Sequence, residues 1–289
     1  MTREFGYCIF AFEGGDWSKD DFEGLDRGFA LAAELGYDYV EVPSYVKPGL
    51  LGGEPRTDLE FFNRLGTVVE LSRKHGVALS SIFAAADLFD EESREIEWHA
   101  LEGLARIAST LGIEHLPVTV GMQRSSDELR WSRQLGALLT EAGRRTLEHG
   151  VRLAVHPHIL CPLETRDEID AFYEAADPAA VGMCLDTGHV LAGGSDPVEL
   201  ARDYAELITY VHAKDVDKEA ADRAAAANDE KARYLTFRDA GDGDVDFAGV
   251  FEMLETAGFN GPILAENDLA LDPEAAMRRS YAQLSAMLS

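Results

Sequence analysis

Four short hydrophobic segments in the second half of the chain end in side chains that can bind metal ions. The segments are residues 152–158 (RLAVHPH), 182–189 (GMCLDTGH), 208–215 (ITYVHAKD) and 262–268 (PILAEND). Their polar ends supply His156, His158, Asp186, His189, His212, Lys214, Asp215 and Glu266. Such imidazoles and carboxylates could hold a divalent cation together with a polar substrate. A buried strand gains nothing by ending in charged groups unless several ends share one pocket.

The spacing of these residues is compatible with one shared pocket. Strand residues two apart lie on the same face, as in the pairs His156 with His158 and His212 with Lys214. Asp186 and His189 are three apart and follow a strand, so both can reach the same site. Asp186 could also act only as a helix N-cap, a position that Asp favours. Glu41, at the end of the second predicted strand, is a further candidate.

The elements that must position these residues alternate along the chain. Strands are predicted at 5–12, 37–42, 77–83 and 113–120, with helices at 22–35, 59–75, 91–111 and 126–149. The four segments described above are the later strands, and helices are predicted near 165–176, 197–207 and 247–257. Five helices end at a glycine that a strand follows at once: Gly36, Gly76, Gly112, Gly150 and Gly258.

This repeat predicts a single α/β domain, a (β/α)8 TIM barrel spanning residues 1–289. The alternative is a doubly wound open sheet. That fold is disfavoured because residues 12–15 (FEGG) do not form the glycine-rich phosphate loop expected after its first strand. In a barrel the carboxyl ends of all strands open onto one face, so the four polar segment ends are expected to converge there.

One interval is longer than the repeat allows. Residues 218–233 are rich in alanine and charge and predict an exposed helix inserted after the seventh strand. Residues 239–246 (DAGDGDVD) resemble a calcium loop, but they lack the closing Glu at the required distance. Turn chemistry explains this second stretch better.

Composition narrows the classes of partner. The net charge of −27 opposes binding to nucleic acid or to anionic membranes, because phosphate surfaces would be repelled. Three cysteines without paired spacing predict no disulfide framework, which fits a reducing cytoplasm. No signal peptide is apparent, and no apolar run approaches the roughly 20 residues that cross a bilayer. We therefore expect a cytoplasmic protein.

The motifs quoted above resemble a known family. From about residue 37 to 266 the chain is similar to the xylose-isomerase-like TIM-barrel superfamily of sugar isomerases, epimerases and dehydratases. HPH, LDTGH followed by GGSDP, VHAKD, and GDGDVDF resemble the inosose (2-keto-myo-inositol) dehydratase branch, as does the inserted helix. The resemblance implies a divalent metal held by one residue from each of strands five to eight: His156, Asp186, His212 and Glu266. Many relatives carry Glu at the position of His156. Two imidazoles and two carboxylates suit Mn2+ or Co2+, with Zn2+ or Fe2+ as alternatives, better than Mg2+.

This ligand set implies chemistry next to a carbonyl. The expected enzyme removes a proton beside the carbonyl of a keto-sugar or keto-cyclitol, giving an enediolate, and then eliminates a β-hydroxyl. Glu266 or His158 is the expected proton-transfer group. His189, Lys214, Asp215 and Glu41 are expected to bind substrate, with Asp215 also able to orient Lys214 or His212.

Alternative functions use the same barrel. A sugar isomerase or epimerase would return the proton to carbon, and a non-catalytic sugar-binding barrel would retain no metal. An apurinic-site endonuclease is disfavoured, since strands one to four end in no histidine and the chain is strongly acidic. Barrels of this family often form homodimers. Substrate choice is expected to depend on loops at 13–17, 44–56 and 84–89.

Overall fold

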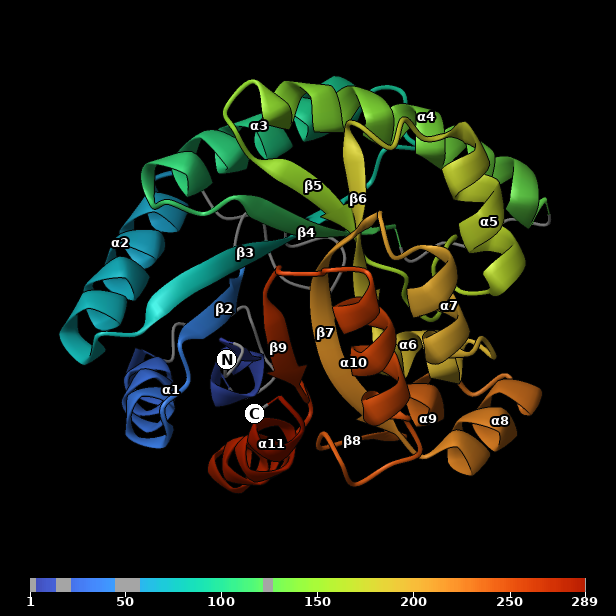
Figure 1. The fold of residues 1–289 in the computed structure, drawn as a ribbon. Helices are drawn as coiled ribbons and strands as arrows, with labels where there is room; N and C mark the ends of the chain where they lie inside the picture. The colour runs from blue at the N-terminus through green and yellow to red at the C-terminus, as the bar shows by residue number, and fades with distance from the viewer. Residues whose placement is uncertain (1–3, 14–21, 45–57, 122–126, 289) are drawn as a thin grey trace.

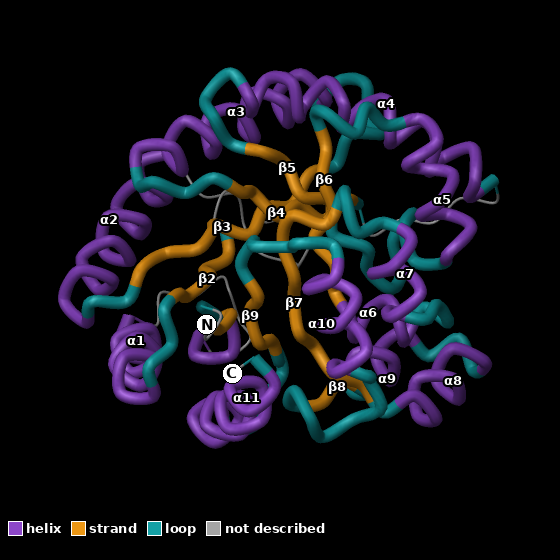
Figure 2. The backbone as a smooth tube through the Cα atoms, viewed as in Figure 1, coloured by secondary structure: helices purple, strands orange, loops and turns teal. Residues whose placement is uncertain are grey.

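Eight parallel strands form a closed barrel in the computed structural model, which describes residues 4–13, 22–44, 58–121 and 127–288. The barrel strands are Gly6–Cys8 (β1), Tyr39–Pro43 (β2), Ala78–Ala86 (β3), His115–Val120 (β4), Arg152–Val155 (β5), Val181–Asp186 (β6), Ile208–Val216 (β7) and Ile263–Glu266 (β9). Strands β1 to β7 pair in chain order except that β9 lies between β7 and β1, and this closes the barrel (Figures 1 and 2). The predicted TIM barrel is confirmed.

The helices form an outer layer around the strands (Figure 1). They are Phe22–Leu35 (α1), Asp58–His75 (α2), Arg94–Thr110 (α3), Glu128–Leu147 (α4), Arg166–Ala175 (α5), Thr187–Ala192 (α6), Pro197–Asp203 (α7), Phe247–Thr256 (α10) and Pro273–Met287 (α11). The five predicted glycine caps are confirmed, because each has a positive φ, between 72° and 91°. The expected strand at 5–12 is wrong in its second half, where Ile9–Glu13 forms a 3-10 helix (η1).

The segment after β7 contains two helices where one was expected. Lys218–Ala226 (α8) and Glu230–Tyr234 (α9) are separated by Asn228, whose φ is +51°. The side chains of Asp217 and Asp229 cap their first turns. Phe237–Arg238 (β8) then pairs antiparallel with the end of β7. These contacts hold the segment against the carboxyl ends of the barrel strands.

The barrel interior beneath those strand ends is apolar. Its cluster of buried side chains comprises Cys8, Phe10, Ala154, Cys184, Tyr210 and Leu264. Four of them stand two residues before His156, Asp186, His212 and Glu266, so strand alternation places them one layer lower on the inward face. The polar side chains at the strand ends therefore pack directly on this layer of apolar side chains. Among the described residues, no helix is long and apolar enough to cross a membrane.

Candidate metal centre

Four side chains from four strands meet at the carboxyl end of the barrel. Each of His156, Asp186, His212 and Glu266 offers one ligand atom, and these atoms all lie within 4.8 Å of one another. None of the four residues is more than 3% exposed. They are the four residues that the family resemblance assigns to a metal, and the structure brings all of them together.

The contacts within this group are close but incompletely paired. His156 Nε2 lies 3.2 Å from Asp186 Oδ2, and His212 Nδ1 lies 2.7 Å from Glu266 Oε2 and 3.9 Å from Asp186 Oδ2. Despite that short distance, neither His212 Nδ1 nor Glu266 Oε2 has a partner with hydrogen-bond geometry. Buried polar atoms are normally hydrogen-bonded, so unpaired ligand atoms that converge on one point suit a bound cation. The residues present fit a divalent metal.

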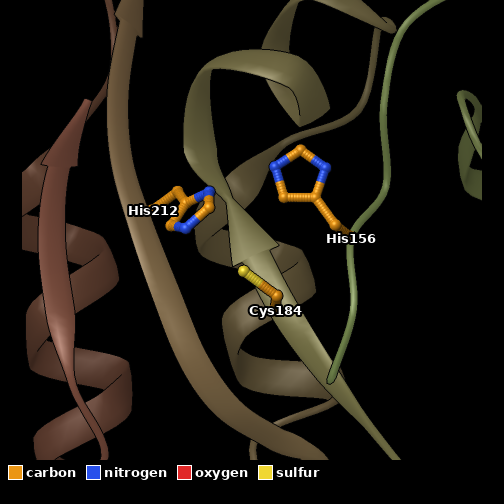
Figure 3. Close-up of side chains that lie close together, drawn as sticks. All are labelled: His156, Cys184 and His212. Carbon is orange, nitrogen blue, oxygen red and sulfur yellow. The ribbon is translucent and has the colours of Figure 1, made fainter. Parts of the chain in front are cut away.

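A thiol lies directly beside these imidazoles. Figure 3 shows the Cys184 sulfur below the rings of His156 and His212, and the three ligand atoms also lie within 4.8 Å of one another. Burial raises the pKa of Cys184 to about 12. The set of His156, Cys184 and His212 is thus a second group whose atoms could hold a metal, and Cys8, Glu41 and His212 form a third, but only the set with Asp186 and Glu266 offers four ligands.

Asp186 has two uses. Its Oδ1 accepts a hydrogen bond of 2.7 Å from the backbone N–H of His189 and so caps α6, while its Oδ2 faces the ligand group. The N-cap that the sequence offered as an alternative is present, and it leaves Oδ2 free to serve as a ligand atom. The cap also favours this direction of the carboxylate, since rotating it would break the hydrogen bond to the His189 N–H.

Lys214 lies beside the ligand group on the same face of β7. Its Nζ is 2.8 Å from Glu266 Oε1 and 3.0 Å from Asp268 Oδ2. Burial alone would lower the pKa of this amine, but the carboxylates of Asp268, Glu266 and Asp186 raise it well above its usual value. The close approach also explains Gly188, because a Cβ there would come within 2.7 Å of the Lys214 side chain. Lys214 is thus a fixed, charged donor.

The imidazoles of His158 and His189 stack next to Lys214. Their ring centroids are 3.7 Å apart, and His189 Nε2 lies 3.2 Å from the Lys214 amine. The backbone N–H of Ile159 donates to His189 Nδ1 at 3.4 Å. Burial, with His156 and Lys214 nearby, lowers the pKa of His158 to about 3, and burial likewise lowers that of His189. Both rings are therefore neutral beside the charged amine.

Asp215 departs from the substrate-facing role that the sequence predicts. Strand alternation turns its side chain to the face of β7 opposite His212 and Lys214. Its carboxylate accepts hydrogen bonds of 2.9 to 3.0 Å from four backbone N–H groups, those of Val216, Gly241, Gly243 and Val245. Asp215 therefore holds the DAGDGDVD loop. The turn chemistry expected for that loop is confirmed.

The structure places Glu41, an expected substrate contact, directly beside His212. It is fully buried on β2, and its Oε1 lies 3.0 Å from His212 Nε2. The carboxylate thus packs against the side of the His212 ring that faces away from Asp186 and Glu266.

Three residues of the site were not predicted from the sequence. Asp268 stands two residues after Glu266, and burial with the Glu266 charge raises its pKa to about 7. The same two-residue spacing that identified Lys214 could have found it. Tyr234 and Phe237 belong to the α8–β8 segment, and their rings lie 6.0 Å from His158 and 4.6 Å from His189. No sequence signal marks these two aromatics.

A buried ion pair attaches the α8–β8 segment to the loop after β5. Arg233 Nη2 lies 2.5 Å from Glu164 Oε1, while Glu164 Oε2 accepts the backbone N–H of Leu160. The segment therefore forms an aromatic side wall of the site. Two expected specificity loops, 13–17 and 44–56, lie almost wholly outside the described residues.

Comparison with known proteins identifies the class. Residues 29–287 match the family described as xylose isomerase-like TIM barrel, and the chain belongs to this family. It is 30% identical over 301 aligned positions to an inosose dehydratase of Geobacillus kaustophilus, covering 93% of this chain and 89% of that protein.

Solved structures show the same fold. A zinc-bound structure of the IolI protein aligns with a TM-score of 0.67 at 18% identity, covering 100% of this chain and 98% of that one. A D-allulose 3-epimerase from Methylomonas sp. in complex with D-allulose aligns with a TM-score of 0.71 at 16% identity, covering 99% and 97%. The relatives named in these comparisons include enzymes of both the dehydratase and the epimerase type.

Proposed function

We propose that this protein is a metal-dependent lyase of the inosose dehydratase type, acting on a keto-cyclitol or keto-sugar. One observation carries the proposal: four ligand-type atoms from β5, β6, β7 and β9 lie within 4.8 Å of one another and include unpaired buried atoms. A divalent cation held by His156, Asp186, His212 and Glu266, with Mn2+ or Co2+ favoured over Zn2+ or Fe2+, would act as a Lewis acid on the carbonyl.

The side chains around the ligand group divide the remaining work. Glu266 or His158 takes the proton from the carbon next to the carbonyl, and the electron pair of the C–H bond moves into an enediolate. His189 and Lys214 hold substrate oxygens, and the Lys214 ammonium can donate to a departing β-hydroxyl so that water leaves. Its contacts with Glu266 and Asp268 keep this donor charged and in place.

The test is proton exchange in D2O across a panel of inososes and keto-sugars, with Mn2+ or Co2+ added. We expect exchange at the carbon next to the carbonyl and loss of water from at least one inosose. His212→Ala should abolish both metal retention and exchange, whereas His99→Ala, on an exposed residue of α3, should change neither. Full activity in the His212 variant would reject the assignment.

A sugar isomerase or epimerase is the second candidate, because the epimerase complex aligns over 99% of this chain. The two reactions share the first step and differ in whether a hydroxyl leaves. Exchange with epimerised product and no loss of water would favour the second candidate. Absence of exchange with every substrate and metal, together with sugar binding, would favour a non-catalytic barrel.

A further inference from the structure

Glu41 reaches His212 across the inside of the barrel. Strands β1 and β9 separate β2, which carries Glu41, from β7, which carries His212. Both side chains have no solvent exposure, and Glu41 Oε1 lies 3.0 Å from His212 Nε2, within ion-pair distance although Nε2, like Nδ1, has no partner with hydrogen-bond geometry. The opposite ring nitrogen, Nδ1, faces Glu266 and Asp186. One imidazole thus lies between a ligand group on one side and a single carboxylate on the other.

The environment of Glu41 gives its charge few other partners. Among the described residues its only ion pair is with His212, and the Cys8 thiol donates a hydrogen bond of 3.6 Å to Oε1. The second oxygen, Oε2, has no hydrogen-bond partner. A buried carboxylate is costly unless a charge or donor compensates it. Glu41 lies on the side of the His212 ring that faces away from Asp186 and Glu266, so it reaches the ligand group through that ring.

We propose that Glu41 is a positioning residue for the metal centre. Its carboxylate keeps the proton of His212 on Nε2, which leaves the lone pair of Nδ1 for the cation and fixes the orientation of the ring. Metal-binding histidines commonly donate their second ring nitrogen to a carboxylate in this way. Phe83 lies beside the ring, 5.8 Å between centroids, and restricts its tilt. This inference rests on the proposed metal-dependent function and deepens it.

The test compares Glu41→Gln with Cys8→Ala. Gln keeps the size of the side chain but removes the charge, and Cys8→Ala removes the thiol that lies near both Glu41 and His212 while leaving the Glu41–His212 pair in place. Affinity for Zn2+ and for Mn2+ is measured by chelator competition, with circular dichroism to verify the fold. We expect Glu41→Gln to weaken metal binding about 10- to 100-fold, the range for such outer partners, and Cys8→Ala to leave it unchanged.

A second readout reports the proton itself. In zinc-loaded protein labelled with 15N-histidine, wild type should show a protonated, slowly exchanging Nε2 at His212, assigned by its absence in His212→Gln. In Glu41→Gln this signal should be absent, or its proton should exchange faster with water. Wild-type affinity and an unchanged signal in Glu41→Gln would overturn the positioning role. Failure of wild-type protein to retain any metal would instead overturn the proposed function, so the two failures are distinct.

Discussion

Two buried carboxylates on adjacent strands, Asp215 on β7 and Glu266 on β9, have opposite surroundings. Asp215 accepts four backbone hydrogen bonds and stabilises a loop. Glu266 accepts no hydrogen bond from a backbone N–H of the described residues. Its oxygens instead lie 2.8 Å from the Lys214 amine and 2.7 Å from His212 Nδ1, and Oε2 lacks hydrogen-bond geometry.

The difference lies in the face of the strand and not in the residue type. Side chains alternate along β7, so Lys214 points inward with His212, and Asp215 points outward toward residues 241–245. A carboxylate with all its acceptor positions filled contributes to folding, whereas one left partly unpaired at a strand end is available to a ligand. Substitution of each should therefore damage a different property.

The largest effect is expected for Glu266→Gln. It removes a charged ligand atom from the four-residue group, so metal affinity should fall by more than the roughly 100-fold seen for outer partners, and turnover should be lost. The fold should survive, because the isosteric amide keeps the packing. Metal content of purified protein and D2O exchange measure the first property, and a urea transition measures the second. The opposite result, a large loss of unfolding free energy with wild-type metal affinity in the folded fraction, would mean that Glu266 stabilises the fold and does not bind the metal.

Asp215→Ala should lower the stability of the fold and leave metal binding intact. It leaves four backbone N–H groups without their acceptor, and we expect a loss of about 3 kcal/mol in unfolding free energy. Gly243→Ala should act in the same direction, because a Cβ there would collide with the Asp215 carboxylate. Urea unfolding checks both variants. The folded fraction should bind metal with the wild-type affinity, and a large loss of affinity without a loss of stability would place Asp215 in the site after all.

Much of the barrel could be predicted because its signals are local. A glycine after a helix requires only its own positive φ, and the strand that follows is set by the barrel repeat. The errors arose in two segments whose secondary structure depends on tertiary contacts. The apolar run 5–12 turns into η1 after Cys8, and the charged stretch 218–233 breaks at Asn228. Neither break leaves a signal in hydrophobic periodicity.

The candidate site likewise contains residues that strand positions predict and residues that only tertiary contacts bring close. Convergence of the strand ends in a barrel predicted one shared location for the eight polar residues of the four segments, and the family resemblance then selected His156, Asp186, His212 and Glu266 from them. Strict use of the two-residue period would have turned Asp215 outward. In contrast, Tyr234 approaches the site because the Arg233–Glu164 ion pair and the pairing of β8 with β7 hold its segment there, and no spacing in the sequence encodes these contacts.

A third carboxylate, Asp26 on α1, lies at the surface, and its substitution should change the unfolding free energy least. It serves as the exposed reference for the two buried carboxylates. It is 39% exposed and lies 2.6 Å from His75 Nε2 and 2.7 Å from Lys74 Nζ. Hydrogen bonds from His75, and then from Lys74, lower its pKa below the usual 3.8. Because the pKa of Asp26 is lower in the folded state, the ionised carboxylate stabilises the fold at pH values above 3.8. This stabilisation is lost as the pH falls through the lowered pKa.

Exposure keeps that contribution small. Asp26→Asn should cost only about 0.5 kcal/mol at neutral pH, and less in high salt, because water and counterions screen a surface pair. Urea midpoints of wild type and variant, compared at neutral pH and again well below pH 3.8, should differ in the first condition and converge in the second. A cost at neutral pH as large as that of Asp215→Ala would mean that burial and satisfied backbone hydrogen bonds are not what separates structural carboxylates from the rest.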